Sequence, residues 1–257
     1  MKQVLWAVFV CLTFFSFDGL EKTKSILVIL AHPDDETAMG PLLAKYGEKH
    51  NVHLVVATDG RYGTQLGTLP AGDSLAAVRK KETECSCKAL GIRPPVFLET
   101  PDGLGMFTSI QTFFRQTKEL KEKIKQQIEK IQPDLIISFG PDGDTGHGDH
   151  RIIGDIVTEI VLREGWYDKY PVYYLAWTKN QADYLGDLNY VHHSYMNVSE
   201  SFSDVHEKQS WAAIKCHKSQ FSEKEIESWV AKDEKDRSNT LHFRKLSLSK
   251  NKRKSLL

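Results

Sequence analysis

Residues 25–36 read SILVILAHPDDE, an apolar run that passes without a break into a histidine and three acidic side chains. The first six residues form a short, uninterrupted run that is rich in β-branched side chains, which predicts a strand buried on both faces. A turn behind such a strand does not require four ionisable groups. The adjacent carboxylates of Asp34 and Asp35 repel each other unless a cation lies near them. This stretch therefore predicts a parallel-sheet core with a cation site at one strand end.

The rest of the chain alternates between strand and helix patterns. We expect further strands at residues 52–58, 96–99, 134–139 and 172–178, and helices at residues 37–49, 73–90, 108–131, 151–163 and 204–217. This alternation predicts an α/β fold: a Rossmann-like, mostly parallel sheet with helices on both faces. In such sheets ligands bind beyond the carboxyl ends of the strands, so we expect the active site there.

Length and charge are those of one globular domain. The chain has 257 residues, 40% of them hydrophobic, and its 34 basic residues balance 34 acidic ones. A neutral chain gives no overall attraction for nucleic acid, and we expect none as a partner. We expect three segments: residues 1–20 as a signal peptide or N-terminal anchor, residues 21–225 as the folded domain, and residues 226–257 as a charged, solvated tail.

The first residues are apolar. The run from Val4 to Phe17 follows Lys2 and is shorter than the ~20 residues of a membrane span. It fits the apolar part of a secretory signal, so we expect export to the periplasm or the extracellular space. An uncleaved anchor, with membrane association only through the N-terminus, and a buried helix are the alternatives.

The four cysteines, at positions 11, 85, 87 and 216, include no C-x-x-C pair. This excludes the usual thiolate metal motifs. Cys85 and Cys87 are two residues apart on an expected helix, where they point to different faces and would bridge poorly. Buried free thiols are therefore expected.

A second polar cluster closes the loop after the strand expected at residues 134–139. Residues 140–150 read GPDGDTGHGDH and end in two histidines, His147 and His150. Because this loop and residues 31–36 leave strands at the same sheet edge, we expect them to meet. Imidazole and carboxylate ligands suit zinc, and a catalytic zinc site uses three protein ligands and leaves one position open.

These segments resemble the N-acetylglucosaminyl-phosphatidylinositol de-N-acetylase family, also called PIG-L or LmbE-like. The resemblance rests on AHPDDE at residues 31–36 and GHGDH at 146–150, and is supported by RKKE at 79–82 and HKSQ at 217–220. It implies a deacetylase domain that hydrolyses the N-acetyl group of an N-acetylglucosamine-containing substrate and releases acetate. The loop at residues 140–151 resembles the bacterial branch, which implies an exported bacterial enzyme acting on a small-molecule or glycan substrate.

The resemblance also implies residue roles. Zn²⁺ is the expected metal, and Fe²⁺ suits the same ligands. The implied metal ligands are His32, Asp35 and His150; the general base is Asp34; and the group that stabilises or protonates the tetrahedral species is His147, with Asp149 as its orienting partner.

Three residues are expected at the substrate. Arg61 stands where the family has an acidic residue, which suggests an anionic substrate group; a solvated arginine is the alternative. Asp102 is expected to bind sugar hydroxyls or to form a turn. Arg79 is expected to hold a substrate phosphate or an internal carboxylate such as Glu82.

Two other functions compete with deacetylation. A metal-dependent phosphoesterase would need a second metal and more carboxylate ligands. The carboxylates without another expected role are Glu36, Asp142 and Asp144. A non-catalytic carbohydrate-binding metalloprotein would keep a closed metal site, in which a free base such as Asp34 has no use.

Overall fold

The computed structural model describes residues 22–104, 109–186, 188–235 and 238–249, with residues 251 and 255. The expected signal peptide at 1–20, including Cys11, and the terminal basic residues 250 and 252–254 lie outside the described residues. No helix among the described residues is both long and apolar enough to cross a membrane.

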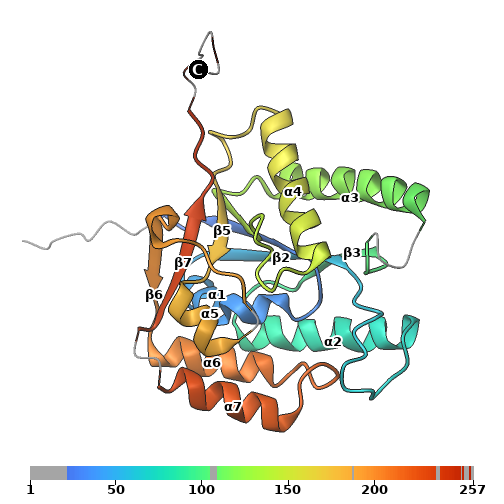
Figure 1. Ribbon diagram of the computed structural model, residues 1–257, viewed down its shortest axis with the longest axis vertical. Helices are drawn as coiled ribbons and strands as arrows, with labels where there is room; N and C mark the ends of the chain where they lie inside the picture. The colour runs from blue at the N-terminus through green and yellow to red at the C-terminus, as the bar shows by residue number, and fades with distance from the viewer. Residues whose placement is uncertain are drawn as a thin grey trace, which may run out of the picture.

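The core is one seven-stranded sheet in the order β3-β2-β1-β4-β5-β7-β6 (Figure 1). Five strands are parallel: β1 (Ser25–Leu30), β2 (Asn51–Thr58), β3 (Val96–Thr100), β4 (Leu135–Ser138) and β5 (Val172–Ala176). The last strand, β7 (Thr240–Lys245), pairs antiparallel with both β5 and β6 (Val198–Ser201). The predicted fold class, a mostly parallel α/β sheet, is confirmed.

Helices cover both faces of the sheet (Figure 1). On one side α3 (Ile110–Ile131) packs against α4 (Gly148–Arg163). On the other, α1 (Gly40–Gly47) and α2 (Asp73–Ala89) pack against α6 (Asp204–Ile214), and α7 (Glu223–Asp233) packs against α6. The short helices η1 (Asp35–Met39), α5 (Lys179–Leu185) and η2 (His193–Tyr195) complete the described elements.

The position of β1 decides where the site forms. Residues 27–31 are fully buried, as a strand covered by helices on both faces requires. β1 pairs with β2 on one side and with β4 on the other. Successive strands are therefore added to one side of β1 up to β3 and to its other side from β4 onward. Ligand sites form at such a topological switch point. The two polar clusters of the sequence follow β1 and β4, and therefore both lie at this point.

The predicted C-terminal tail is wrong over two stretches. Residues 223–233 form α7 and residues 240–245 form β7, which lies inside the sheet between β5 and β6. The folded domain therefore extends about twenty residues beyond the predicted boundary at residue 225.

The predicted free thiols are also wrong for two of the cysteines. Cys85 on α2 and Cys216 beyond α6 form a disulfide, with their Cα atoms 5.8 Å apart. Cys87 is a free and buried thiol. The prediction that Cys85 and Cys87 do not bridge each other holds, but the true partner lies 131 residues away.

Candidate metal and catalytic site

Three ligand atoms converge beyond the ends of β1 and β4. Asp35 Oδ1 lies 3.6 Å from His32 Nδ1 and 3.1 Å from His150 Nε2, and the two imidazole nitrogens are 3.2 Å apart. In a tetrahedral zinc site with bonds of ~2.0–2.2 Å, ligand atoms stand roughly 3.3–3.6 Å apart. The three residues expected as ligands therefore have the spacing that a small divalent ion requires.

Neighbouring groups fix which nitrogen of each histidine faces this point. His32 Nε2 lies 3.2 Å from the Asp149 carboxylate, and His150 Nδ1 lies 3.0 Å from the Gly143 carbonyl oxygen. In a neutral imidazole each of these nitrogens would carry its proton toward that acceptor, and the lone pair of the other nitrogen would face this point. Metal-binding histidines are commonly oriented by such hydrogen bonds.

Asp35 is held in the same way. Its Oδ2 accepts hydrogen bonds from the backbone N–H groups of Ala31 and His32, at 3.0 and 2.7 Å, which leaves Oδ1 facing the imidazoles. Burial would raise the pKa of Asp35, but the two histidines outweigh it and hold that pKa well below its usual value. Burial likewise opposes the charge on His32, yet Asp35 and Asp149 raise its pKa to about 10. The site therefore stabilises positive charge at this point.

His147 is the third imidazole of the cluster. Ligand atoms of His32, His147 and His150 lie within 4.8 Å of one another. However, His147 Nδ1 accepts a hydrogen bond from the Asp149 backbone N–H at 3.1 Å, so the proton of a neutral His147 is on Nε2. Burial, then the charge on His32, lower the pKa of His147 and favour this neutral form. A protonated Nε2 donates a hydrogen bond and does not bind a metal.

Asp149 contacts both His32 and His147. Its carboxylate contacts His32 Nε2 and accepts a hydrogen bond from the Gly103 backbone N–H at 2.8 Å. Only its backbone N–H reaches His147. The carboxylate therefore orients a candidate metal ligand, whereas the backbone N–H of Asp149 orients His147.

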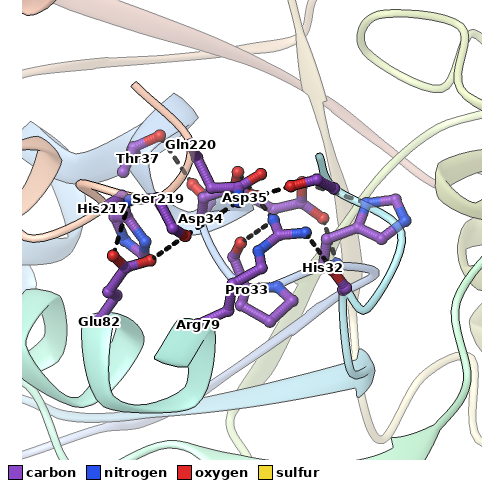
Figure 2. Close-up of polar contacts among 12 residues, drawn as sticks. His32, Pro33, Asp34, Asp35, Thr37, Arg79, Glu82, His217, Ser219 and Gln220 are labelled. Atoms are coloured by element: carbon purple, nitrogen blue, oxygen red, sulfur yellow. Dashed lines mark hydrogen bonds and ion pairs between the residues drawn. The ribbon is translucent and has the colours of Figure 1, made fainter. Parts of the chain in front are cut away.

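Asp34 has a strained backbone that Arg79 holds in place (Figure 2). Its φ of 116° lies in the left-handed region that non-glycine residues seldom adopt. The Arg79 guanidinium pairs with Asp34 Oδ2 at 2.9 Å and also donates hydrogen bonds to the carbonyl oxygens of Pro33 and Gly60. Burial raises the pKa of Asp34, and Arg79 opposes that shift. Such strain is typical of functional positions.

The supporting motifs RKKE and HKSQ contact each other and the HPDDE loop (Figure 2). Glu82 accepts hydrogen bonds from Ser219 through its backbone N–H, at 2.8 Å, and its hydroxyl, at 2.6 Å. His217 pairs with Glu36 at 2.7 Å, and both side chains are fully buried. The Cys85–Cys216 disulfide joins α2 to the residue just before the HKSQ segment. Together these contacts hold the turn after α6 against the loop that carries Asp34 and Asp35.

The three residues expected at the substrate lie in different environments. Arg79 is only 3% exposed and is engaged by the protein, so it reaches no open surface. Arg61 pairs with Asp59 at 2.6 Å and with Asp73 at 3.1 Å, so its charge is already matched and does not favour an anionic substrate. Asp102 is buried, and its Oδ1 has no hydrogen-bond partner among the described residues. The unpartnered Oδ1 is itself a buried atom, so Asp102, like Arg79, is enclosed by the protein.

Comparison with known proteins identifies related chains. A family model described as PIG-L, GlcNAc-PI de-N-acetylase, matches residues 27–161. A 1D-myo-inositol 2-acetamido-2-deoxy-α-D-glucopyranoside deacetylase from Kineococcus radiotolerans is 29% identical over 58% of this chain, which spans only 48% of that protein. A probable N-acetyl-α-D-glucosaminyl L-malate deacetylase 2 from Bacillus cereus is 27% identical over 77% of this chain and 84% of its own length.

A similar solved structure is the N,N'-diacetylchitobiose deacetylase from Pyrococcus horikoshii. It is 26% identical to this chain, with a TM-score of 0.62, and the match covers 91% of this chain and 87% of that one. The similarity therefore extends well beyond residues 27–161.

Proposed function

The chain belongs to the PIG-L family of de-N-acetylases, and on this premise we propose that it is a metal-dependent deacetylase of an N-acetylglucosamine-containing substrate. The reaction hydrolyses the amide bond and releases acetate and the free amino sugar. The observation that carries the proposal is the convergence of His32 Nδ1, Asp35 Oδ1 and His150 Nε2. Asp34, Asp35 and His150 line a cavity of about 550 Å³, whose other walls come from α5, α6, α7 and β7.

We propose that His32, Asp35 and His150 hold the metal. Two imidazole nitrogens and one carboxylate oxygen suit Zn²⁺, and Fe²⁺ is compatible with the same set. When bound, such an ion supplies Lewis-acid polarisation of the amide carbonyl and increases the acidity of water at neutral pH.

The chain's own residues carry the proton transfers and the charge. Asp34 accepts a proton from the attacking water and returns it to the leaving amine nitrogen, and its raised pKa makes it a stronger base than an ordinary aspartate. His147 donates a hydrogen bond from Nε2 to the oxyanion that develops on the carbonyl oxygen.

The side chains that the competing functions would need are already bound within the protein. A two-metal phosphoesterase would need Glu36, Asp142 and Asp144, but these carboxylates contact His217, Arg244 and Trp177 respectively. A carbohydrate-binding metalloprotein has no use for Asp34, whose strained conformation is held by a buried arginine.

We also propose that the protein is exported. The Cys85–Cys216 disulfide supports this, because disulfides persist in oxidising compartments and are rare in the cytosol. Mass spectrometry of the mature N-terminus and cell fractionation test the proposal. An intact Met1 on a cytosolic protein with reduced cysteines contradicts it.

The decisive experiment measures acetate release from a panel of N-acetylglucosamine conjugates with zinc-loaded protein. Replacing the base, Asp34→Ala, is expected to leave metal content unchanged and to reduce kcat/KM by at least about a hundredfold. Asp155→Ala, on the exposed side of α4, is the matched control and retains activity. Full turnover by the Asp34 variant refutes the assignment of the base, and no release by the wild type refutes the function.

A further inference from the structure

Three groups hold Asp34, one at each of its polar ends. Its carboxylate pairs with Arg79, and its carbonyl oxygen accepts a hydrogen bond of 2.7 Å from the Thr37 hydroxyl (Figure 2). Its backbone N–H donates a hydrogen bond of 3.2 Å to Glu36 Oε2. An aspartate keeps a φ of 116° only where its surroundings impose that conformation. The orientation of the proposed base is therefore set by these neighbours.

Glu36 is itself held by a residue from a distant part of the chain. Its other carboxylate oxygen, Oε1, lies 2.7 Å from Nε2 of His217, in the turn after α6. The two residues are 181 positions apart in the sequence, and both side chains are fully buried. The carboxylate of Glu36 therefore connects the imidazole of His217 to the backbone N–H of Asp34.

Stability alone does not account for this buried ion pair. Replacing such a pair by apolar side chains of similar volume commonly leaves a protein equally stable or more stable. His217 also leaves its Nδ1 buried without a hydrogen-bond partner among the described residues, which is a further cost. Buried ionic groups can instead serve to fix one conformation of the residues that they contact. Here the contacted residue with an unusual conformation is Asp34.

We propose that Glu36 and His217 are positioning residues for the deacetylation reaction. His217 fixes the carboxylate of Glu36, Glu36 fixes the backbone N–H of Asp34, and the carboxylate of Asp34 is thereby aimed at the attacking water. Because both side chains are fully buried, they act through Asp34 and not by contact with the substrate. The inference rests on the proposed function, in which Asp34 is the base.

The main test replaces both residues by leucine, Glu36→Leu with His217→Leu. This double variant removes the acceptor of the Asp34 N–H without leaving an unpaired buried charge, so we expect it to fold and to bind one zinc ion per chain. Its kcat for acetate release should fall about ten- to a hundredfold, the effect of displacing a catalytic group by up to ~1 Å. Its KM should stay near the wild-type value. A folded, zinc-loaded double variant with wild-type kcat overturns the proposal.

Two single variants at position 217 give an independent comparison at nearly constant volume. His217→Gln keeps an N–H donor for Glu36 and should keep a kcat close to that of the wild type, even where the lost charge lowers stability. His217→Met fills the space without a donor and should lower kcat as the leucine pair does. Equal kcat values for the glutamine and methionine variants overturn the proposal.

Two further comparisons separate positioning from a general loss of structure. Lys45→Leu with Glu200→Leu removes another ion pair, of 3.0 Å between α1 and β6, and should keep the wild-type kcat. In an Asp34→Ala background, the leucines at positions 36 and 217 should lower the residual kcat no further, because residues that act through one group are not additive. A second loss of the same size in that background overturns the proposal.

A crystal structure of the leucine pair variant gives a readout that does not depend on turnover. We expect Asp34 to leave its φ of 116° for an ordinary negative value, since the contact that holds its N–H is gone. An unchanged φ overturns the proposal even if kcat falls. Wild-type protein that releases no acetate refutes the proposed function separately, because the crystal structure still decides whether Glu36 and His217 hold Asp34.

Discussion

Asp34 shows how one residue is fixed by groups distant in sequence. Its backbone lies in a region that costs an aspartate of order 1–3 kcal/mol, and it persists because Arg79 binds both its carboxylate and the carbonyl oxygen of Pro33. Glycine is required at positions 60 and 63, because a Cβ at either would collide with the Arg79 guanidinium. The turn at residues 59–63 therefore serves the base by making room for its arginine.

The roles of the two histidines of the HGDH segment can be separated by metal content. His150 offers a free lone pair to the metal, whereas His147 is expected to offer a proton. We expect His150→Ala to lose the metal, measured by elemental analysis of dialysed protein. His147→Ala should keep one ion per chain and lose about a hundred- to a thousandfold in kcat, the usual effect of deleting an oxyanion donor. Loss of the metal from both variants would instead make His147 a ligand.

At the residue scale the sequence predicted which side chains gather but not all of their contacts. The residues of HPDDE and HGDH meet as expected, because both segments leave adjacent parallel strands. The partners of Arg61, Arg79 and Asp149 did not follow from spacing, since each depends on a side-chain direction set by another loop. Asp59 and Asp73, which neutralise Arg61, carried no signal beyond ordinary turn and cap residues.

At the scale of elements, whether the sequence predicts a strand depends on how completely that strand is buried. Strands β1 to β5 are short apolar runs, and all five were predicted. The strands β6 and β7, VSES and TLHFRK, are largely polar and owe their conformation to antiparallel pairing with each other and with β5. Such pairing is tertiary, and single-strand propensity does not detect it.

The disulfide is expected to stabilise the contact between α2 and the turn after α6. Replacing both cysteines, Cys85→Ser with Cys216→Ser, should lower the free energy of unfolding by about 2–4 kcal/mol in urea titrations. Because the turn carries His217 and Ser219, kcat/KM should fall as well. A reductant should have the same effect on the wild type and none on the double variant. An unchanged wild type under full reduction contradicts this role.

The buried pair of His217 and Glu36 predicts a pH window for stability. Burial opposes both charges, but each partner outweighs it, so the pKa of His217 is raised and the pKa of Glu36 is lowered. The contribution of His217 is complete below its ordinary pKa of 6.5 and disappears as pH rises through its raised value. That of Glu36 is complete above 4.5 and disappears as pH falls through its lowered value.

Urea titrations at several pH values check this expectation. The difference in unfolding free energy between wild type and His217→Gln should be largest between about pH 4.5 and 6.5 and should shrink on either side. A difference independent of pH would mean that the pair is not ionised.

For the whole molecule, the metal is expected to act as a cross-link. Its proposed ligands come from the segments that follow β1 and β4, more than a hundred residues apart in the sequence. Zinc at a thousand times its Kd should stabilise the folded state by about 4 kcal/mol, which raises Tm by roughly 10 °C for a domain of this size. Thermal unfolding with and without chelator measures the effect, and His150→Ala should show none. An equal rise in that variant would place the ion elsewhere.

The strand order has a consequence for the nascent chain. The strands that position both ligand loops, β1 and β4, leave the ribosome early, whereas β7 enters the sheet between β5 and β6 only after about a hundred more residues have been made. At synthesis rates of about 5–20 residues per second, several seconds separate these events. During that interval the edge of β5 and the future walls of the cavity are uncovered, which makes this stage of biogenesis a point where a chaperone would bind.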